Sequence, residues 1–489
     1  MQLPQQLLDS LTGVAGFDKE AFIQVHESGE QVTSVRVNGA KASMLARRSL
    51  SEGGVNFEWS KGQIPFKIDQ LELTTNNKIP WSSNGYYLPE RPAFIFDPLI
   101  HAGAYYVQEA SSMFVEQALT QTTDVSQPLR VLDLCAAPGG KSTLLQSLIS
   151  ADSLLVSNEV IKSRAAILEE NSIKWGGANV IVTNADPTAF ERLPNFFDVI
   201  VIDAPCSGSG LFRRDGEAIG EWSEQNVDLC YQRQQRILAA VLPALKEGGV
   251  LIYSTCSYSK EEDEHMADWL MDTFSVDSLP LAIDASWGIV ETQSDKHRAW
   301  GYRFFPYKVK GEGFFISCFR KQDGGNSVVR PPKKSLLQKA SKTETGIIQP
   351  WLQSGSPVQL WKQKEDLLAF PQQLEKELLI IVDNVYVRRA GIAIGKIAGN
   401  DLVPDHALAL STIINPAIVA VTLKKEEALQ YLRREEVSLS MGHKGWTLVQ
   451  FEHYNVGWIK VLANRINNYY PQGWRILKRG TTDSANENR

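Results

Sequence analysis

Five short apolar segments, separated by stretches with helical periodicity, dominate the middle of the chain. Strands that alternate with helices pair in parallel, so this pattern predicts a doubly wound α/β sheet. We also expect a helix from about Gln232 to Lys246 and a late strand, Phe314–Phe319, that closes the domain. The five predicted strands are Arg130–Leu134, Leu154–Ser157, Val180–Val182, Asp198–Ile202 and Gly249–Tyr253.

Two cysteines follow the last two predicted parallel strands. Cys206 comes after the strand that ends at Ile202, and Cys256 after the strand that ends at Tyr253. Ligands and catalytic groups collect at the carboxyl ends of strands in open α/β sheets. We therefore expect both thiols in one pocket, as a nucleophile and a helper. The ordinary alternative for a free cysteine is burial as a small apolar side chain.

The composition narrows the class of protein. The chain has 489 residues, 43% of them hydrophobic, which is enough for several domains. Its five cysteines lack CxxC spacing and its seven histidines lack ligand spacing, so we expect neither a disulfide framework nor a metal site. We see no secretory signal and no apolar run that could span a bilayer. A cytoplasmic protein is expected, and a monomer is the simplest expectation.

The net charge of −6 argues against a polyanionic partner, but two stretches are basic. Basic residues with interleaved aromatic ones suit a nucleic-acid surface, and a solvated basic face is an equally good interpretation. The first stretch, residues 31–51, contains Arg36, Lys41, Arg47 and Arg48. The second, residues 458–480, contains Lys460, Arg465, Arg475, Lys478 and Arg479 among Trp458, Tyr469, Tyr470 and Trp474.

Composition also suggests a domain division. An amphipathic opening helix and the alternating segment Val32–Val37 predict a small α+β unit at the start. Leu379–Val387 reads as a strand, and glycines at 391, 395 and 399 indicate turns of a small β-rich barrel near the end. We expect an N-terminal RNA-binding unit at 1–100, a catalytic domain at 101–320, a linker at 321–350, a C-terminal RNA-binding unit at 351–480 and a polar tail at 481–489.

A glycine-rich loop follows the first predicted strand and leads into a helix. Glycines let a ligand approach the main chain, and a helix N-terminus offers unpaired N–H groups. The loop lacks the GxxxxGK[ST] spacing, so NTP binding is only weakly indicated. Lys141 is equally well interpreted as a cofactor or target ligand and as a surface lysine. The loop consists of Cys135, Ala136, Ala137, Pro138, Gly139, Gly140 and Lys141.

Two acids follow the next two strands. Glu159 is spaced to accept hydrogen bonds from a ribose diol, and Asp186 is placed to hold an adenine amino group. Either carboxylate alone is more often a helix cap or a turn residue. Together with the glycine loop they indicate a nucleoside cofactor site without a phosphate-neutralising cluster. That combination suits S-adenosylmethionine better than a nicotinamide dinucleotide.

The thiols indicate the reaction. Carbon 5 of a pyrimidine is a poor nucleophile, but a thiolate added to carbon 6 creates an enamine that attacks a sulfonium methyl group. A base then removes the C5 proton and the thiol leaves. Asp203 precedes Cys206 and is placed to contact the N3 and amino edge of cytosine. Chemistry alone leaves open which thiol attacks, because DNA cytosine methyltransferases use a Pro-Cys at the position of Cys206.

These motifs together resemble the RNA cytosine-C5 methyltransferases of the NOL/NOP/Sun family. The resemblance rests on Tyr106–Met113, Cys135–Lys141, Asp203–Gly208, Ser254–Ser257 and the Arg303 to Phe315 run. It implies a Rossmann-like methyltransferase core, S-adenosylmethionine as cofactor, Cys256 as the nucleophile, and Cys206 as the thiol that assists proton removal and product release. It also implies cofactor contacts from Cys135–Lys141, Glu159, Asp186 and Asp203.

The length and the β-rich, PUA-like C-terminal extension resemble those bacterial family members that methylate a cytosine in the decoding region of 16S rRNA, within the small subunit. Alternatives remain open: a tRNA cytosine-C5 methyltransferase, a non-catalytic ribosome assembly factor and, more remotely, a thiol oxidoreductase. Arg213 and Arg214 are expected to contact RNA phosphates. The acidic run Glu261–Glu264 is expected as the first turn of a helix, stabilised by its dipole.

Overall fold

A computed structural model describes residues 3–51, 67–68, 71–325, 327, 329–437, 439 and 441–478, with the backbone alone at 46–51 and 67. The side chains of Arg47 and Arg48, the predicted basic residue Arg479 and the tail 481–489 lie outside the described residues.

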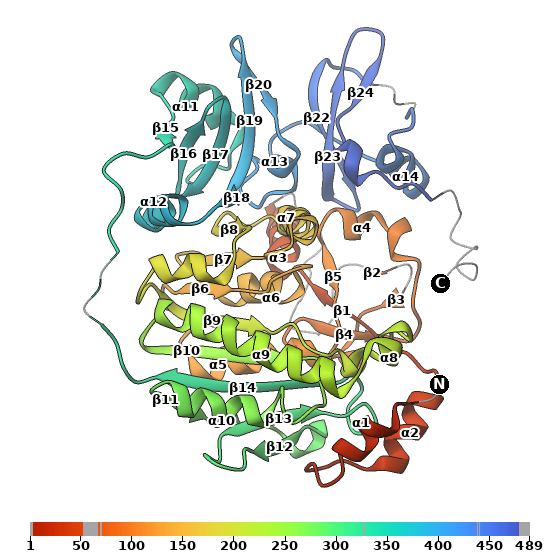
Figure 1. Cartoon of the computed structure of the whole chain (residues 1–489). Helices are drawn as coiled ribbons and strands as arrows, with labels where there is room; N and C mark the ends of the chain where they lie inside the picture. The colour runs from red at the N-terminus through yellow and green to blue at the C-terminus, as the bar shows by residue number, and fades with distance from the viewer. Residues whose placement is uncertain are drawn as a thin grey trace.

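The centre of the molecule is a mixed sheet in the order β12-β13-β14-β10-β9-β6-β7-β8-β18 (Figure 1). The predicted parallel strands form its middle, and β14 (Phe314–Lys321) closes one side by antiparallel pairing with β10. The predicted doubly wound core is therefore confirmed. The parallel strands are β6 (Arg130–Asp133), β7 (Leu154–Asn158), β8 (Val180–Thr183), β9 (Phe197–Asp203) and β10 (Leu245–Thr255); the other strands are β11 (Val276–Leu279), β12 (Val290–Gln293), β13 (Trp300–Phe304) and β18 (Val387–Ala390).

Alternate residues of the strands pack into two hydrophobic cores, one on each face of the sheet. In β9, Val199 and Val201 belong to one core, and Ile200 and Ile202 to the other. Because both faces are covered, the strands read as continuous apolar runs. One face carries α5 (Val115–Thr122), α6 (Gly140–Leu148) and α7 (Lys162–Trp175), and the other carries α9 (Glu224–Val241), α10 (Glu264–Thr273) and α12 (Glu375–Asn384).

The helix before β10 differs from the prediction. It was expected from Gln232 to Lys246, but α9 begins at Glu224, because Ser223 Oγ accepts a hydrogen bond from the Asn226 N–H at 3.1 Å and caps the helix. The helix ends at Val241 because Pro243 follows, and Lys246 already lies in β10.

The N-terminal residues contribute a small sheet and two helices. β1 (Thr33–Val37) lies between β4 (Gly85–Leu88) and β5 (Tyr105–Val107), so the predicted strand is confirmed. α1 (Gln5–Ser10) and α2 (Lys19–Glu27) pack with Phe212, Tyr258 and Phe305 of the core. Short elements at 39–114 are α3 (Gly39–Ser51), β2 (Lys67–Ile68), β3 (Leu71–Glu72), η2 (Thr75–Asn77), η3 (Phe94–Phe96), α4 (Pro98–His101) and η4 (Ser111–Phe114).

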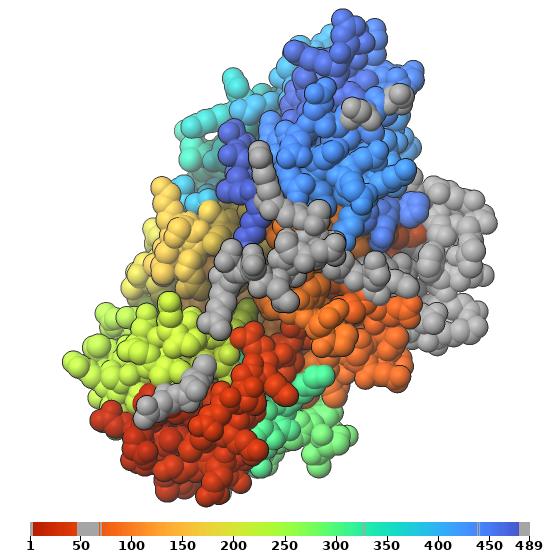
Figure 2. Space-filling model, turned by 90° about the vertical axis from the view of Figure 1, so that its right-hand side faces the viewer, coloured from red at the N-terminus to blue at the C-terminus, as the bar shows by residue number. Residues whose placement is uncertain are grey.

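The C-terminal residues form two further sheets at the opposite end of the molecule from α1 and α2 (Figures 1 and 2). The first consists of β15 (Gln338–Lys339), β16 (Val358–Gln363), β17 (Asp366–Pro371), β19 (Ile392–Ala398) and β20 (Asp401–Pro404). The second consists of β21 (Ala420–Thr422), β22 (Gly445–Phe451), β23 (Tyr454–Val461) and β24 (Ile466–Asn468). Besides α12, which packs on the central sheet, the α-helices between these strands are α11 (Lys342–Ile348), α13 (His406–Leu410) and α14 (Lys425–Arg433).

The strand predicted at Leu379–Val387 is wrong over most of its length. Residues 375–384 form α12, whose Leu378 and Ile381 pack into the core of the central sheet. A short apolar run in a sequence is compatible with either a buried strand or a buried helix. In the structure this run is helical, and its buried residues Leu378 and Ile381 are one helical turn apart. The chain after α12 then forms β18, which pairs antiparallel with β8 and extends the central sheet.

The two basic stretches differ: Arg36 and Lys41 of the first are internal, whereas Arg465, Arg475 and Lys478 of the second are exposed. Arg36 and Lys41 are buried, as are Trp458 and Tyr470 of the second stretch. The interpretation of these four residues as a nucleic-acid surface is therefore wrong. The pattern of charges in the sequence does not reveal this burial, because the partners of Lys41 are main-chain carbonyls and not acidic side chains. Lys41 Nζ donates to the carbonyls of Ala102 and Lys174, each at 2.6 Å.

The three parts of the chain meet at the C-terminal end of α7. Asn38 donates hydrogen bonds to the carbonyls of Gly103 and Trp175, each at 3.0 Å. From the C-terminal part, the Thr412 N–H donates to the Gly176 carbonyl at 3.0 Å. Gly103 has φ +65°, and a Cβ there would lie 1.9 Å from the Lys174 carbonyl oxygen. The junction therefore requires glycine at this position.

We expect Gly103→Ala to destabilise the fold more than Gly13→Ala does. Gly13 has φ +84° with no atom within 4 Å of an added Cβ, so its replacement costs backbone strain alone. Gly103→Ala adds the clash with Lys174, which we expect to cost roughly 1–3 kcal/mol more. Urea unfolding of both variants measures this difference, and equal stabilities would contradict the close packing at this junction.

Candidate active site

The two thiols lie together at the carboxyl ends of β9 and β10. Cys206 Sγ and Cys256 Sγ are 3.1 Å apart, so one thiol can donate a hydrogen bond to the other. In the parallel pairing of these strands Ser254 lies beside Asp203, which brings the two following loops side by side. The structure therefore places the two cysteines side by side, while their roles as nucleophile and helper stay a prediction. Both are partly exposed, whereas Cys230 and Cys318 are buried.

Glu262 connects the two loops that carry the thiols. Its buried carboxylate accepts hydrogen bonds from the Ser207 N–H at 2.9 Å, from Ser207 Oγ at 2.5 Å and from Ser257 Oγ at 2.6 Å. Gln234 Nε2 of α9 donates a fourth at 3.1 Å. A serine follows each thiol in the sequence, but no spacing rule links these serines to Glu262.

The acidic run before α10 does not act as predicted. The sequence predicts an acidic first helical turn at Glu261–Glu264, stabilised by the helix dipole, but Glu262 and Asp263 are buried and the helix begins only at Glu264. Buried Arg303 of β13 donates to both carboxylate oxygens of Glu264 and to the Tyr258 carbonyl, and lies 3.1 Å from Asp263. These acids therefore fix the chain after Cys256 rather than complement a helix dipole.

Lys141 lies inside the site and is not a surface lysine. Its Nζ is 2.8 Å from Asp203 Oδ2, and Ser254 Oγ donates to Asp203 Oδ1 at 3.0 Å. Burial alone would lower the pKa of Lys141, but the negative charges of Asp203, Cys256 and Asp133 raise it. The Lys141 ammonium group of the glycine-rich loop thus pairs with Asp203 and interacts electrostatically with Cys256.

The glycine-rich loop is held from several directions. Gly139, with φ +118°, precedes the first residue of α6, and the Ala136 N–H donates to the Asn158 carbonyl at 2.8 Å. Arg36 of β1 donates to the Gly140 carbonyl at 3.1 Å and to Thr143 Oγ1 at 2.6 Å. The first N–H groups of α6 have no partner within the helix and remain available to a ligand.

Asn158 is a second residue that sequence reasoning missed. Its side chain donates to the carbonyls of Leu134 and Ala185 at 3.1 and 3.0 Å, and accepts from the Ala185 N–H and from Thr183 Oγ1. It therefore ties together the ends of β6, β7 and β8. The adjacent Glu159 is placed by this arrangement at the edge of the same loop.

The two predicted cofactor acids differ in their surroundings. Glu159 is buried, accepts a hydrogen bond from the Ile161 N–H at 2.9 Å and lies 3.7 Å from Arg164. Asp186 is exposed, and its Oδ1 accepts from the N–H and Oγ1 of Thr188. Asp186 thus caps a 3-10 turn, the ordinary alternative considered for it.

The charges around the loop favour a cationic ligand. Asp133, Glu159 and Asp203 supply carboxylates around Cys135, and Lys141 pairs with Asp203. Asp133 is buried with Oδ1 unpartnered among the described residues, and desolvation raises its pKa to about 7. A buried acid with one unpartnered oxygen among the described residues, the buried Glu159 and free helix N–H groups together fit a sulfonium nucleoside with a carboxylate tail.

The two thiols differ in their electrostatic surroundings. The hydrogen bond with Cys256, burial and the charges of Cys256 and Glu262 raise the pKa of Cys206. Cys256 instead interacts with the ammonium group of Lys141. These surroundings favour the protonated form of Cys206.

Arg213 does not contact a ligand surface. It is buried, donates to the carbonyls of Gly311 and Glu30, and lies 3.6 Å from Glu312. The prediction that Arg213 binds RNA phosphates is therefore wrong. The sequence around Arg213 does not reveal its partner, because Glu312 is about a hundred residues away along the chain. Arg214 is exposed, so its phosphate contact stays a prediction.

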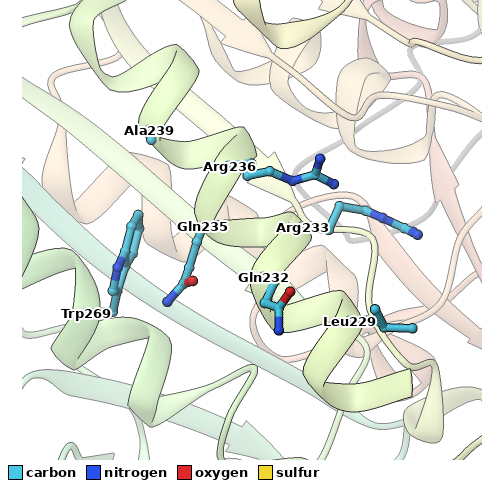
Figure 3. A pocket seen from close by; sticks show the side chains of 7 residues that line it. All are labelled: Leu229, Gln232, Arg233, Gln235, Arg236, Ala239 and Trp269. Carbon is cyan, nitrogen blue, oxygen red and sulfur yellow. The ribbon is translucent and has the colours of Figure 1, made fainter. Parts of the chain in front are cut away.

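Helix α9 has a second side that faces away from the thiols. Gln234 contacts the thiol loops, whereas Arg233, Arg236 and Leu229 line an open groove toward Trp269 of α10 (Figure 3). None of the predicted site residues lines this groove.

Comparisons with known proteins agree with this site. The family model "16S rRNA methyltransferase RsmB/F" matches residues 121–320, the model of the N-terminal domain of RsmF matches 60–110, and the RsmF PUA domain matches 419–476. Ribosomal RNA small subunit methyltransferase F of Escherichia coli K12 is 30% identical over 430 residues, covering 83% of this chain and 87% of the relative. The chain belongs to the RsmB/F family of 16S rRNA methyltransferases.

Further relatives give the same result. The methyltransferase F of Vibrio parahaemolyticus is 31% identical over 424 residues, covering 81% of this chain and 85% of the relative. The crystal structure of PH0851 has a TM-score of 0.52 and 22% identity, with 65% of this chain and 66% of that chain covered, and shows the fold alone. The predicted family, its methyltransferase core and the PUA-like C-terminal region are thus confirmed.

As a member of the RsmB/F family, the chain is a methyltransferase whose methyl donor is S-adenosylmethionine. No described helix is long and apolar enough to cross a membrane.

Replacement of Asp133 tests the buried acid at the loop. Its pKa rises from 3.8 to about 7 on folding, so the folded state holds a proton that the unfolded state loses. Wild-type stability relative to Asp133→Asn should therefore be highest below pH 4 and fall as the pH rises toward about 7. Urea unfolding of both proteins between pH 4 and 8 measures this, and a constant difference would contradict it.

Arg213→Ala should act on stability rather than on RNA affinity. It leaves the Glu312 carboxylate buried without its partner, which we expect to cost about 3 kcal/mol. Arg214→Ala, at the exposed neighbour, is the matched control and should change stability by less than about 0.5 kcal/mol. Thermal unfolding separates the two, and equal midpoints would count against the buried role of Arg213.

Proposed function

We propose that this chain methylates carbon 5 of a cytosine in the decoding region of 16S rRNA, within the assembled small subunit, through a covalent bond between Cys256 and cytosine C6. The observation that carries this proposal is the pair of thiols 3.1 Å apart at the ends of β9 and β10. Methylation of a ring carbon needs one thiol to activate the ring and benefits from a second group to release it.

The two cysteines take different roles. Cys256 attacks C6 as the thiolate, because it interacts with the Lys141 ammonium group. Cys206 stays protonated beside it and acts later, when the C5 proton leaves and the bond to C6 breaks. S-adenosylmethionine, when bound, supplies an electrophilic methyl group on its sulfonium.

Asp203 orients the base. Its carboxylate lies between Lys141 and Ser254, three residues before Cys206, where it can accept from the amino group of a cytosine above the thiols. This contact fixes the amino edge of the base, while the positive charge of the paired Lys141 ammonium group offsets the negative charge that builds on the ring during thiolate addition. The paired Lys141 holds the carboxylate in position and limits the cost of its partial burial.

The cofactor contacts follow from the same strand ends. Glu159 accepts from the ribose hydroxyls, Asp186 uses its uncapped oxygen on the adenine amino group, and Asp203 lies on the reactive side. The N–H groups of the first turn of α6 hold the carboxylate tail. The remaining contacts come from the glycine-rich loop, Cys135, Ala136, Ala137, Pro138, Gly139, Gly140 and Lys141.

The proposal that the substrate is ribosomal RNA is supported by the names of the relatives and by the matched PUA domain. The matched relatives are named for the small-subunit ribosomal RNA, and the PUA domain model matches residues 419–476. The target cytosine must leave its stack, because a thiol at a strand edge cannot reach C6 inside a helix. Transfer RNA is the alternative substrate.

We also propose the domain division suggested by composition, with residues 1–100 and 351–480 as RNA-binding units around a catalytic domain at 101–320. The linker 321–350 follows β14, and β18 returns the chain to the central sheet. β5 at 105–107 lies after the proposed boundary at residue 100 but pairs with β1 of the N-terminal unit. The sheet of the N-terminal unit therefore includes one strand from beyond this boundary.

Variants of the two cysteines test the mechanism. Cys206→Ala should accumulate a stable protein–RNA adduct with small subunits and S-adenosylmethionine, because release from C6 is impaired. Cys256→Ala should form no adduct and transfer no methyl group. A denaturing gel with methyl-labelled cofactor measures both, with tRNA as a parallel substrate.

Each other outcome has a distinct meaning. An adduct with Cys256→Ala alone would move the attack to Cys206. Adducts with tRNA and not with small subunits would reassign the substrate. Absence of label with either RNA in the wild-type protein would favour an assembly factor that binds without catalysis.

A further inference from the structure

The residue after each thiol is a serine, and the two serines share one acceptor. Ser207 Oγ and Ser257 Oγ both donate to Glu262 Oε2, at 2.5 and 2.6 Å, and lie 3.3 Å from each other. The Ser207 N–H binds the other carboxylate oxygen at 2.9 Å. A single buried carboxylate therefore holds the residue that follows each cysteine.

Glu262 is itself fixed by neighbouring elements. Tyr253 Oη of β10 donates to the Glu262 carbonyl at 2.7 Å and to Gln234 Oε1 at 3.0 Å. Gln234 Nε2 donates in turn to Glu262 Oε1 and to the Pro205 carbonyl, each at 3.1 Å. The carboxylate is thus held between β10, α9 and the loop that carries Cys206.

We propose that Glu262 is the positioning residue of the thiol pair: its carboxylate clamps Ser207 and Ser257 and so holds Cys206 and Cys256 at the separation that the reaction needs. The Glu262 carboxylate binds the residues that follow the thiols, so it acts through the two loops. Two other hydrogen bonds join these loops, from the Gly210 N–H to the Cys256 carbonyl at 2.8 Å and from the Tyr258 N–H to Ser209 Oγ at 2.9 Å. Without the clamp these bonds remain, but Ser207 and Ser257 lose the acceptor that they share.

The charge of Glu262 also makes the electrostatic surroundings of the two thiols different. The charge of Glu262 lies on the Cys206 side, while the ammonium group of Lys141 acts on Cys256. A negative group disfavours a second negative charge nearby, and a positive group favours one. Glu262 therefore holds the two thiol loops together and also favours the protonated form of Cys206.

Glu262→Ala should separate the thiols in a protein that still folds. A trivalent arsenical, phenylarsine oxide, bonds two adjacent thiols at once and releases water, so its affinity reports their separation without RNA or cofactor. We expect at least about tenfold weaker binding than to the wild type, approaching that of Cys206→Ala, and a kcat for methyl transfer reduced by about 10²-fold with the KM for RNA changed less than about threefold.

The matched control is Glu261→Gln. Glu261 is the neighbouring glutamate and makes no hydrogen bond to either thiol loop among the described residues. It should retain wild-type arsenical affinity and kcat. The pH dependence of thiol alkylation adds a second readout, since removal of the Glu262 charge should shift ionisation of Cys206 to lower pH.

A folded Glu262→Ala protein that binds the arsenical as tightly as the wild type would overturn the proposal. If Glu262→Ala fails to fold, the double variant Ser207→Ala, Ser257→Ala removes both hydroxyl contacts and must show the same loss of arsenical affinity. The inference about kcat rests on the proposed function, but the arsenical measurement does not. If the wild-type protein binds the arsenical tightly but transfers no methyl group, the proposed function is contradicted and the positioning role of Glu262 is not.

Discussion

The parallel pairing of β9 with β10 is the constraint on which the site depends. Their register places Ser254 beside Asp203, so the loops that follow begin at the same edge of the sheet. β6 pairs with the other side of β9, which brings the glycine-rich loop next to Asp203. Backbone hydrogen bonds therefore assemble a site whose members are scattered over more than a hundred residues of sequence, and side chains only refine it.

The parts outside the core are joined to it through main-chain carbonyls. Arg36 reaches the first turn of α6, while Asn38 and Lys41 reach the end of α7. A carbonyl carries no net charge, so it offsets the desolvation of a buried cation less than a carboxylate would, and desolvation lowers the pKa of Lys41 to about 7. The N-terminal part is thus bound to the helices that flank the glycine-rich loop, so its position and the shape of that loop are linked.

The sequence allowed prediction of the features that local patterns encode. The five parallel strands stand out because both faces of the sheet are covered and each strand reads as an apolar run. The two thiols and the glycine-rich loop follow, since they occupy strand ends. Glu262, Asn158 and Arg303 could not be predicted, because their roles depend on partners distant in sequence. The helix at 375–384 was mistaken for a strand because its short apolar run has no decisive periodicity.

Opposite charges on either side explain how two chemically identical thiols can differ. Because they lie side by side, they cannot both ionise at little cost, since a second negative charge at this distance is strongly disfavoured. Lys141 approaches from the glycine-rich loop and Glu262 from the chain before α10, so the two charges act on different sulfur atoms. The protonated form is therefore favoured at Cys206. Both charges are themselves fixed, Lys141 by Asp203 and Glu262 by Gln234 and two serines, so the asymmetry is built into the fold before any substrate arrives.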